Sequence, residues 1–177
     1  MKNDYIRSLY SYGFASIDFC FYKTNLSVCF RPWIMNSSLG ENQYDAKKFI
    51  VTTISTESTA SLYYLAQKII AGEVNTPLQY VIECNKQATL RFEFDGENTV
   101  LIIEKNGEKI VFGFLTHQYM VKEEGRVITK TIHCGLVAFT EILQAYLIAV
   151  SADRQQEQRD RGEFGASQVP MSSAGWR

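Results

Sequence analysis

The chain repeats one order of predicted elements, strands followed by a helix, and this repeat limits its possible folds more than any other feature. A strand pattern ending at Ile54 leads into a helical pattern at 58–71, and one ending at Ile132 leads into a helical pattern at 136–149. Aligning the two isoleucines also superposes matching Ala, Leu and Ile residues along both helices. We therefore predict an α+β fold of two pseudo-repeated four-strand antiparallel sheets, each followed by a helix.

A β-hairpin is predicted upstream of each helix. In the second half, Asn106-Gly107 is a strong signal for a two-residue type I′ turn, because both central residues of that turn need a positive φ. This loop pairs Glu104 with Lys109 and Ile103 with Ile110, so unlike charges meet and apolar side chains meet.

In the first half, Thr24-Asn25 is predicted to form the corresponding turn. The resulting register pairs Phe21 with Val28 and Asp18 with Arg31. Because side chains alternate along a strand, both hairpins then have one mainly apolar face. The predicted core residues are Ile17, Phe19, Phe21, Val28 and Phe30 in the first half, and Leu90, Phe92, Phe94, Leu101, Ile103, Ile110, Phe112 and Phe114 in the second.

The second helix is apolar almost all round, which predicts cover on two sides. One stripe consists of Leu136, Phe139, Leu143, Tyr146 and Val150, and a second consists of Ala138, Ile142, Ala145 and Ala149. The first helix and the sheets of the same chain could supply this cover, and so could an oligomer interface. The sequence leaves both interpretations open.

We predict one domain over 1–150, built of two halves at about 1–73 and 78–150. The segment 36–42 has the composition of a polar loop. Residues 151–177 are rich in Gln, Arg, Asp, Glu, Gly and Ser and contain almost no aliphatic side chains, so we predict a disordered C-terminal tail.

Several features favour a cytoplasmic protein, in the bacterial host if a phage encodes it. The N-terminus has no apolar signal-peptide segment, and the apolar stretch 136–150 is interpreted as too short and too polar to span a bilayer. The four cysteines are then expected to be reduced, although the predicted register places Cys20 opposite Cys29, within reach of a disulfide.

The sequence offers little for catalysis. It contains two histidines, and its His, Cys and carboxylate residues lack metal-ligand spacing. Cys134 opens a helix beside His133, but neighbours in sequence do not face each other, so a structural cysteine is favoured over a nucleophile. We predict that the protein is not an enzyme and binds neither cofactor nor metal.

A net charge of −1 gives no general indication of nucleic-acid binding, so a binding surface would have to be local. The outer strand faces combine aromatic rings, which stack on bases, with cations, which neutralise phosphates. The predicted nucleic-acid-binding residues are Tyr22, Arg31, Trp33, Lys47, Lys48, Arg91, Lys109 and Lys130. In the alternative interpretation, Tyr22 and Trp33 only cover a sheet edge and Arg31 pairs with Asp18.

The order of strands and helices over about 5–150, with aromatic and basic strand faces, resembles the Whirly fold of plant Whirly proteins and kinetoplastid mitochondrial RNA-binding proteins. This resemblance implies single-stranded nucleic acid bound across the sheets and a tetramer assembled through the helices. The lysine-containing strand motif of the plant proteins has no clear match here. By size, charge and a polar tail ending near Trp176, the chain also looks like the single-stranded-DNA-binding RNA polymerase cofactors of Schitoviridae phages.

The resulting hypothesis is a sequence-tolerant, oligomeric single-stranded DNA-binding protein, acting in phage replication or early transcription by recruiting an RNA polymerase. Its expected partners are single-stranded DNA, a phage RNA polymerase and further copies of itself, in a tetramer, and no membrane. The alternatives are a single-stranded RNA-binding or annealing protein, and an oligomeric scaffold that binds only protein.

Overall fold

The computed structural model describes residues 6–22, 24–36, 41–45 and 47–166. The elements of the first half are β1 (Ile6–Ser11), β2 (Ala15–Phe21), β3 (Asn25–Asn36), β4 (Glu41–Tyr44), β5 (Ile50–Ser55) and α1 (Thr56–Ile70). Those of the second half are β6 (Leu78–Cys84), a 3-10 turn (Asn85–Gln87), β7 (Ala88–Phe94), β8 (Thr99–Lys105), β9 (Glu108–Gly113), β10 (His117–Glu123), β11 (Arg126–Ile132) and α2 (Cys134–Ala166).

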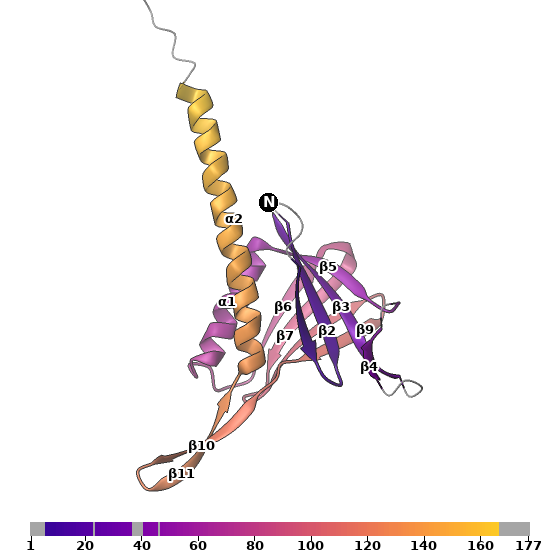
Figure 1. The fold of residues 1–177 in the computed structure, drawn as a ribbon, viewed down its shortest axis with the longest axis vertical. Coiled ribbons are helices and arrows are strands. Elements are labelled where there is room, and N and C mark those ends of the chain that lie inside the picture. The colour runs from indigo at the N-terminus through magenta and orange to yellow at the C-terminus, as the bar shows by residue number, and fades with distance from the viewer. Residues whose placement is uncertain (1–5, 23, 37–40, 46, 167–177) are drawn as a thin grey trace, which may run out of the picture.

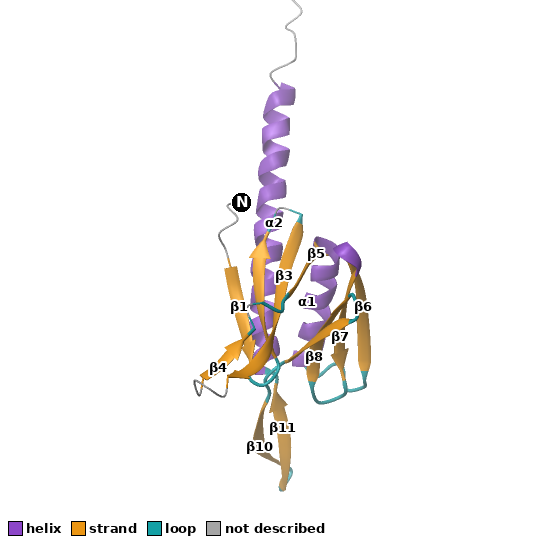
Figure 2. Ribbon diagram, turned by 90° about the vertical axis from the view of Figure 1, so that its right-hand side faces the viewer, coloured by secondary structure: helices purple, strands orange, loops and turns teal. Residues whose placement is uncertain are grey.

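The strands form two main antiparallel sheets and one small one (Figures 1 and 2). In sheet 1 the order is β1-β2-β3, and the far side of β3 is shared by β5, along its first part, and β4, along its last part. Sheet 2 has the order β6-β7-β8-β9, while β10 and β11 pair with each other and with no other described strand. The predicted α+β fold of two antiparallel sheets, each followed by a helix, is confirmed, and β4 is an addition to the four strands predicted for sheet 1.

Both helices lie on the same side of the sheets and pack against each other (Figure 1). The first stripe of α2 is fully buried, and its Phe139 ring contacts Phe19 of β2 at 5.9 Å and Phe114, just after β9, at 5.1 Å between centroids. One helix therefore joins the apolar faces of both sheets. The predicted core faces of both hairpins are confirmed as buried.

The start of α1 is fixed by a local hydrogen bond. The Ser55 hydroxyl accepts from the Ser58 N–H at 3.1 Å, as expected of an N-cap. At the other end Gly72 has a φ of 70°, which is the conformation that ends many helices. Ser55 and Gly72 therefore mark the two ends of α1.

The two predicted hairpins differ in outcome. The β8–β9 register is confirmed, and Asn106 and Gly107 both have positive φ values. The β2–β3 register is wrong by two residues, because Phe21 faces Leu26 and Asp18 faces Cys29. A two-residue shift keeps every side chain on its predicted face, so alternation could not detect it.

The structural register has a physical advantage, because it places Leu26 inside the ladder, where this residue is fully buried. It also separates two cysteines that the predicted register placed opposite each other. Cys20 now faces Ser27, and neither Cys20 nor Cys29 is part of a disulfide.

The prediction of a disordered tail from Ser151 is wrong as far as Ala166, because α2 continues to that residue. Gln, Arg, Glu and Ala are good helix formers, and extending an existing helix avoids the cost of a new nucleus. Gln156 donates to Asp160 at 2.8 Å, a contact between successive turns. Residues 167–177 of the predicted tail lie outside the described part of the chain.

This extension also removes part of the argument against a membrane span, because Cys134–Gly162 is long and apolar enough to cross a bilayer by length and composition alone. The buried stripe of α2 within the protein core explains that apolar character without a membrane.

Two strands were not predicted. Glu41–Tyr44, within or next to the predicted polar loop, forms β4 against the end of β3, and His117–Glu123 forms β10. Because β11 pairs with β10 outside sheet 2, it is not the structural counterpart of β5. The two halves are therefore alike in their sheets and helices, and β10–β11 is an addition to the second half.

Candidate nucleic-acid interface

Five aromatic residues gather on the outer face of sheet 1, the side away from the core. The set, called the aromatic face below, consists of Tyr10, Tyr12, Trp33, Tyr44 and Phe49. The strand registers explain this grouping. Tyr10 faces Ser16, which in turn faces Arg31, and Trp33 faces Tyr44. Because β5 begins at Ile50 opposite Phe30, Phe49 lies beside Arg31.

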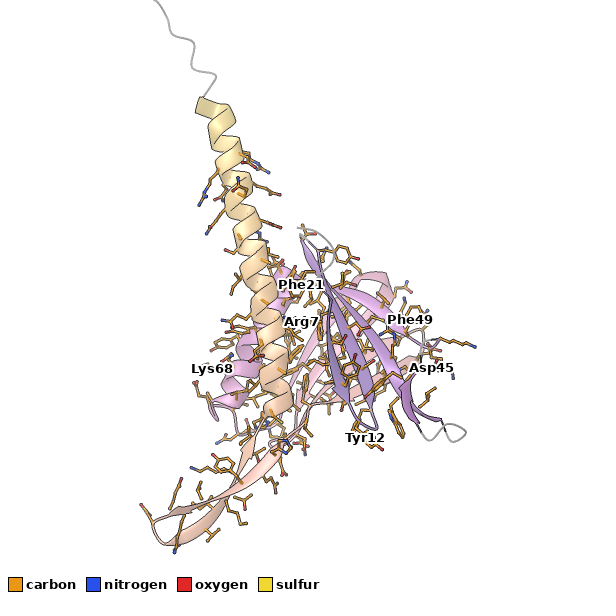
Figure 3. All side chains as sticks on the ribbon, viewed as in Figure 1. Arg7, Tyr12, Phe21, Asp45, Phe49 and Lys68 are labelled. Atoms are coloured by element: carbon orange, nitrogen blue, oxygen red, sulfur yellow. The ribbon has the colours of Figure 1, made fainter. Side chains whose placement is uncertain are left out.

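Four of the five rings of the aromatic face touch one another in pairs. Tyr10 and Tyr44 have centroids 5.5 Å apart, and Tyr12 and Trp33 have centroids 5.7 Å apart. Tyr10, Tyr12 and Phe49 are nevertheless 67%, 73% and 53% exposed. Figure 3 shows Tyr12 at the turn end of the first hairpin of sheet 1 and Phe49 at its far edge. Such exposed rings offer flat surfaces to a ligand.

Trp33 and Tyr44 also carry polar atoms. The indole Nε1 of Trp33 is buried and has no hydrogen-bond partner among the described residues. A buried donor without a partner is costly, so it is a ready donor for a ligand atom that reaches it. Burial, followed by the nearby Tyr10, raises the pKa of Tyr44, which keeps this hydroxyl neutral at neutral pH.

Arg31 lies within the aromatic face but is already paired. Its guanidinium donates to the Asp18 carboxylate, which also accepts from the Ser8 hydroxyl at 2.7 Å. The pairing with Asp18 that the alternative interpretation of the sequence proposed is therefore present. A phosphate near Arg31 would have to share the guanidinium with Asp18, since arginine has several donors.

Two lysines flank the aromatic face in the loop between β4 and β5. Lys47 and Lys48 are exposed, and their backbone N–H groups donate to the Asp45 carboxylate at 2.8 and 3.1 Å. These bonds lower the pKa of Asp45, which is therefore ionised and offsets part of the lysine charge. Figure 3 shows Asp45 and Phe49 on neighbouring parts of this edge.

The structure thus brings four of the eight predicted residues to one region, namely Arg31, Trp33, Lys47 and Lys48. Tyr22 is exposed but lies at the opposite end of the β2–β3 ladder, because its N–H donates to Asn25 at 3.1 Å. Trp33 is at the far end of β3, roughly 25 Å away for a strand of this length.

The other three predicted cations are elsewhere and are engaged by carboxylates. On sheet 2, Arg91 contacts Glu104 at 2.8 Å, and Lys109 lies 3.9 Å from the same carboxylate. Lys130 of β11 pairs with Glu123 of β10. These cations are poorer candidates for phosphate contacts than the two loop lysines.

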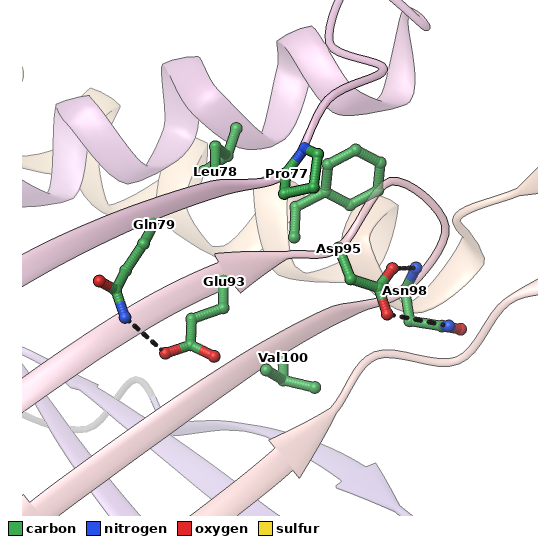
Figure 4. A pocket seen from close by; sticks show the side chains of 8 residues that line it. Pro77, Leu78, Gln79, Glu93, Asp95, Asn98 and Val100 are labelled. Carbon is green, nitrogen blue, oxygen red and sulfur yellow. Dashed lines mark hydrogen bonds between the residues drawn. The ribbon is translucent and has the colours of Figure 1, made fainter.

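The hollows of the surface differ in character. One of about 440 Å³ on sheet 2, drawn in Figure 4, is lined by the carboxylates of Glu93 and Asp95, which disfavour phosphate. Another of about 420 Å³ lies between the sheets and is lined by Tyr10, Tyr12 and Phe14. The second hollow is therefore continuous with the aromatic face.

Four residues of the aromatic face were not predicted from the sequence, namely Tyr10, Tyr12, Tyr44 and Phe49. Tyr10 lies on β1, whereas Tyr12 lies in the turn after it and reaches this face through its contact with Trp33. Tyr44 joins Trp33 through β4, which was not predicted, and Phe49 precedes the start of β5. Their grouping depends on pairing between strands and not on spacing along one strand.

The described residues offer little for catalysis. They include no group of three or more His, Cys, Asp or Glu side chains placed to hold a metal. The Cys134 thiol donates to the Leu115 carbonyl at 3.1 Å, a structural contact at the start of α2. Burial raises the pKa of the Cys29 and Cys84 thiols, which disfavours the reactive thiolate.

Comparisons with known proteins add little. No protein-family model and no curated protein matches the chain. Among solved structures, crystal structures of MRP1/MRP2 from Trypanosoma brucei match with 13% identity and a TM-score of 0.44, covering 85% of this chain and 98% of that one. A likeness at this level assigns neither a family nor a function.

Proposed function

We propose that this protein binds single-stranded DNA without strong sequence preference, and that bases stack on the aromatic face. The observation that supports this proposal is the set of five rings on the outer face of one sheet, three of them exposed and four in contact in pairs, with cations at its edge. Every base has a flat π-face, so a stacking surface tolerates any sequence.

The proposed site combines two contributions to affinity. Each base that stacks on a ring contributes about 1–3 kcal/mol. Arg31, Lys47 and Lys48 are the proposed phosphate contacts. With these three cations, binding of a single strand should weaken with salt at a logarithmic slope of about −2.

The proposal also covers the oligomeric state of the protein and its biological role. The protein would act as a homo-oligomer, a tetramer, in the cytoplasm of an infected bacterium. It would take part in phage replication or early transcription by recruiting an RNA polymerase, without catalysis of its own. The support for this part is the sequence resemblance in size, charge and polar tail. RNA remains the alternative ligand, since an aromatic surface does not by itself distinguish the two sugars.

Electrophoretic mobility shifts with labelled oligo-dT, poly-U and duplex of equal length test the central proposal. At about 50 mM salt the single strands should be retarded more strongly than the duplex, and raising the salt to about 200 mM should weaken binding. No retardation of any ligand at low salt would exclude nucleic-acid binding, while stronger binding of poly-U would favour RNA.

A pair of matched variants locates the site. Tyr12→Ala should weaken oligo-dT binding roughly tenfold, because it removes one exposed ring from the aromatic face. Tyr64→Ala removes a similarly exposed tyrosine from α1 and should leave affinity unchanged. Equal effects of the two substitutions would move the site away from sheet 1.

A further inference from the structure

The β10–β11 hairpin, residues 117–132, projects from the body of the protein in both views (Figures 1 and 2). We call it the hairpin arm. Its direction is set at its base, where Gln118 donates to Glu97 of the β7–β8 turn at 3.1 Å and the Gly135 N–H donates to Leu115 O at 2.9 Å. The arm is therefore an ordered projection.

Both faces of the hairpin arm expose apolar side chains. Met120 and Val127 are 75% and 66% exposed on one face. Tyr119, Ile128 and Ile132 are exposed on the other face. A two-stranded hairpin is marginally stable in water, and exposed apolar area of this kind indicates a surface that packs on a partner.

The charges of the hairpin arm disfavour nucleic acid as that partner. Lys122, Arg126 and Lys130 exceed Glu123 and Glu124 by only one charge, and Lys130 already pairs with Glu123. A phosphate backbone needs a clear excess of cations. A protein partner fits this arm better.

The alternation of hydrogen-bonded and non-hydrogen-bonded pairs along the hairpin shows which backbone N–H and C=O groups are not used in pairing β10 with β11. Glu124 and Gly125 both have positive φ, as a two-residue type I′ turn requires, so Glu123 and Arg126 form the hydrogen-bonded pair that closes the turn. Alternation from that pair makes Met120 and Thr129 a non-hydrogen-bonded pair. The N–H and C=O groups of Met120 then point outward from β10, and those of Thr129 point outward from β11.

The sequence of β10 is complementary to itself in the antiparallel direction. In a symmetric pair centred on Met120, Tyr119 faces Val121 of the other copy and His117 faces Glu123 of the other copy. Apolar side chains meet apolar ones, and the imidazole meets a carboxylate. The outward groups of Met120 lie where this ladder needs them.

The sequence of β11 does not have this property. A symmetric pair centred on Thr129 places Ile128 opposite Lys130 and Arg126 opposite Ile132. Centring it on Ile128 places Arg126 opposite Lys130, two like charges. These mismatches favour β10 as the edge that pairs.

We propose that two copies of this protein join through their β10 edges, forming one four-stranded antiparallel sheet from two hairpin arms with Met120 at its two-fold axis. An isologous contact of this kind is the commonest symmetry of protein dimers. It specifies one interface of the oligomer proposed above and does not depend on nucleic-acid binding.

Sedimentation equilibrium of the full chain without nucleic acid tests this proposal. The wild type should associate, and Met120→Pro should weaken association roughly tenfold or more. Proline has no N–H donor, and because both copies carry the substitution, both hydrogen bonds of the central pair are lost. Thr129→Pro is the matched control, since it places proline in the same cross-strand row but on the other edge, and it should sediment like the wild type. A monomeric wild type, or equal behaviour of the two variants, would overturn the proposal.

Two cysteine substitutions, Met120→Cys and Thr129→Cys, test the pairing even if proline unfolds the hairpin arm. The Cα atoms of the central pair would be about 5.5 Å apart, which suits a disulfide. Mild oxidation of Met120→Cys should yield a covalent dimer, whereas oxidised Thr129→Cys should resemble the oxidised wild type with its native thiols. Absence of a Met120→Cys dimer would contradict the pairing even if the wild type associates, and would leave the proposed DNA-binding function unaffected.

Discussion

At the residue scale, Asp18 limits what Arg31 can offer to a phosphate, because the two side chains form an ion pair within the aromatic face. Asp18→Asn should therefore raise the affinity for oligo-dT several-fold at low salt, since it removes the competing carboxylate. It should also lower the free energy of unfolding by about 1 kcal/mol. Fluorescence anisotropy and urea denaturation measure the two effects.

Glu73→Gln is the matched control for this substitution. It makes the same change in net charge but frees Lys68, which lies on α1 away from the aromatic face. Its effect on affinity should be smaller. Equal gains in the two variants would mean that net charge, and not Arg31, controls binding.

A second residue-scale effect concerns His133, at the junction between β11 and α2. Burial lowers the pKa of this imidazole below its ordinary value of 6.5, because the charged form is poorly solvated there. The unfolded chain then binds more protons than the folded chain below pH 6.5. The stability contributed by the neutral imidazole is therefore complete above that pH and is lost as the pH falls toward the folded-state pKa.

His133→Gln should remove this part of the pH dependence. The free energy of unfolding of the wild type, relative to that of the variant, should be lower at pH 5 than at pH 8. Urea denaturation at each pH measures both free energies. A difference that stays constant over this range would show that His133 titrates normally in the fold.

At the scale of elements, the start of α2 depends on a close approach of backbone. A Cβ added to Gly135 would lie 2.5 Å from the Leu115 nitrogen, so Gly135→Ala must displace the backbone after β9 or the helix itself. We expect a loss of at least about 2 kcal/mol in the free energy of unfolding. Thermal denaturation followed by circular dichroism measures it.

Gly162→Ala in the projecting part of the same helix provides the control. A Cβ there has no atom of the described residues within 4 Å, so the helix propensity of alanine should make this change neutral or slightly stabilising. If Gly135→Ala were equally harmless, the contact between Gly135 and Leu115 would not support the fold.

Elements also show what the sequence could and could not predict. Alternation predicted which faces are buried, and Asn106-Gly107 predicted one register, because each depends on neighbouring residues only. The β2–β3 register was predicted wrongly, since a shift of two residues leaves each side chain on the same face of the sheet. The extension of α2 beyond Val150 was not predicted, because its polar composition suggested disorder. Its helix propensity and its continuity with a buried helix instead make it helical.

At the scale of the whole molecule, the candidate site is a product of topology. Trp33 and Arg31 could be singled out on one strand, but the aromatic face exists only because β1, β3, β4 and the residue before β5 meet on one sheet. The hairpin arm is separate from this face in both sequence and structure. If arms join copies, a long single strand could contact several aromatic faces, and its affinity would exceed that of a short strand by avidity.

The most direct test of the aromatic face uses Trp33 as its own reporter. The chain has two tryptophans, so a Trp176→Phe variant leaves the Trp33 fluorescence alone. Titration with oligo-dT should quench this emission in a saturable way, with the same midpoint as binding measured by anisotropy, and equal-length duplex should quench it far less. Binding of oligo-dT that leaves the Trp33 emission unchanged would contradict the proposal that single strands stack on the aromatic face.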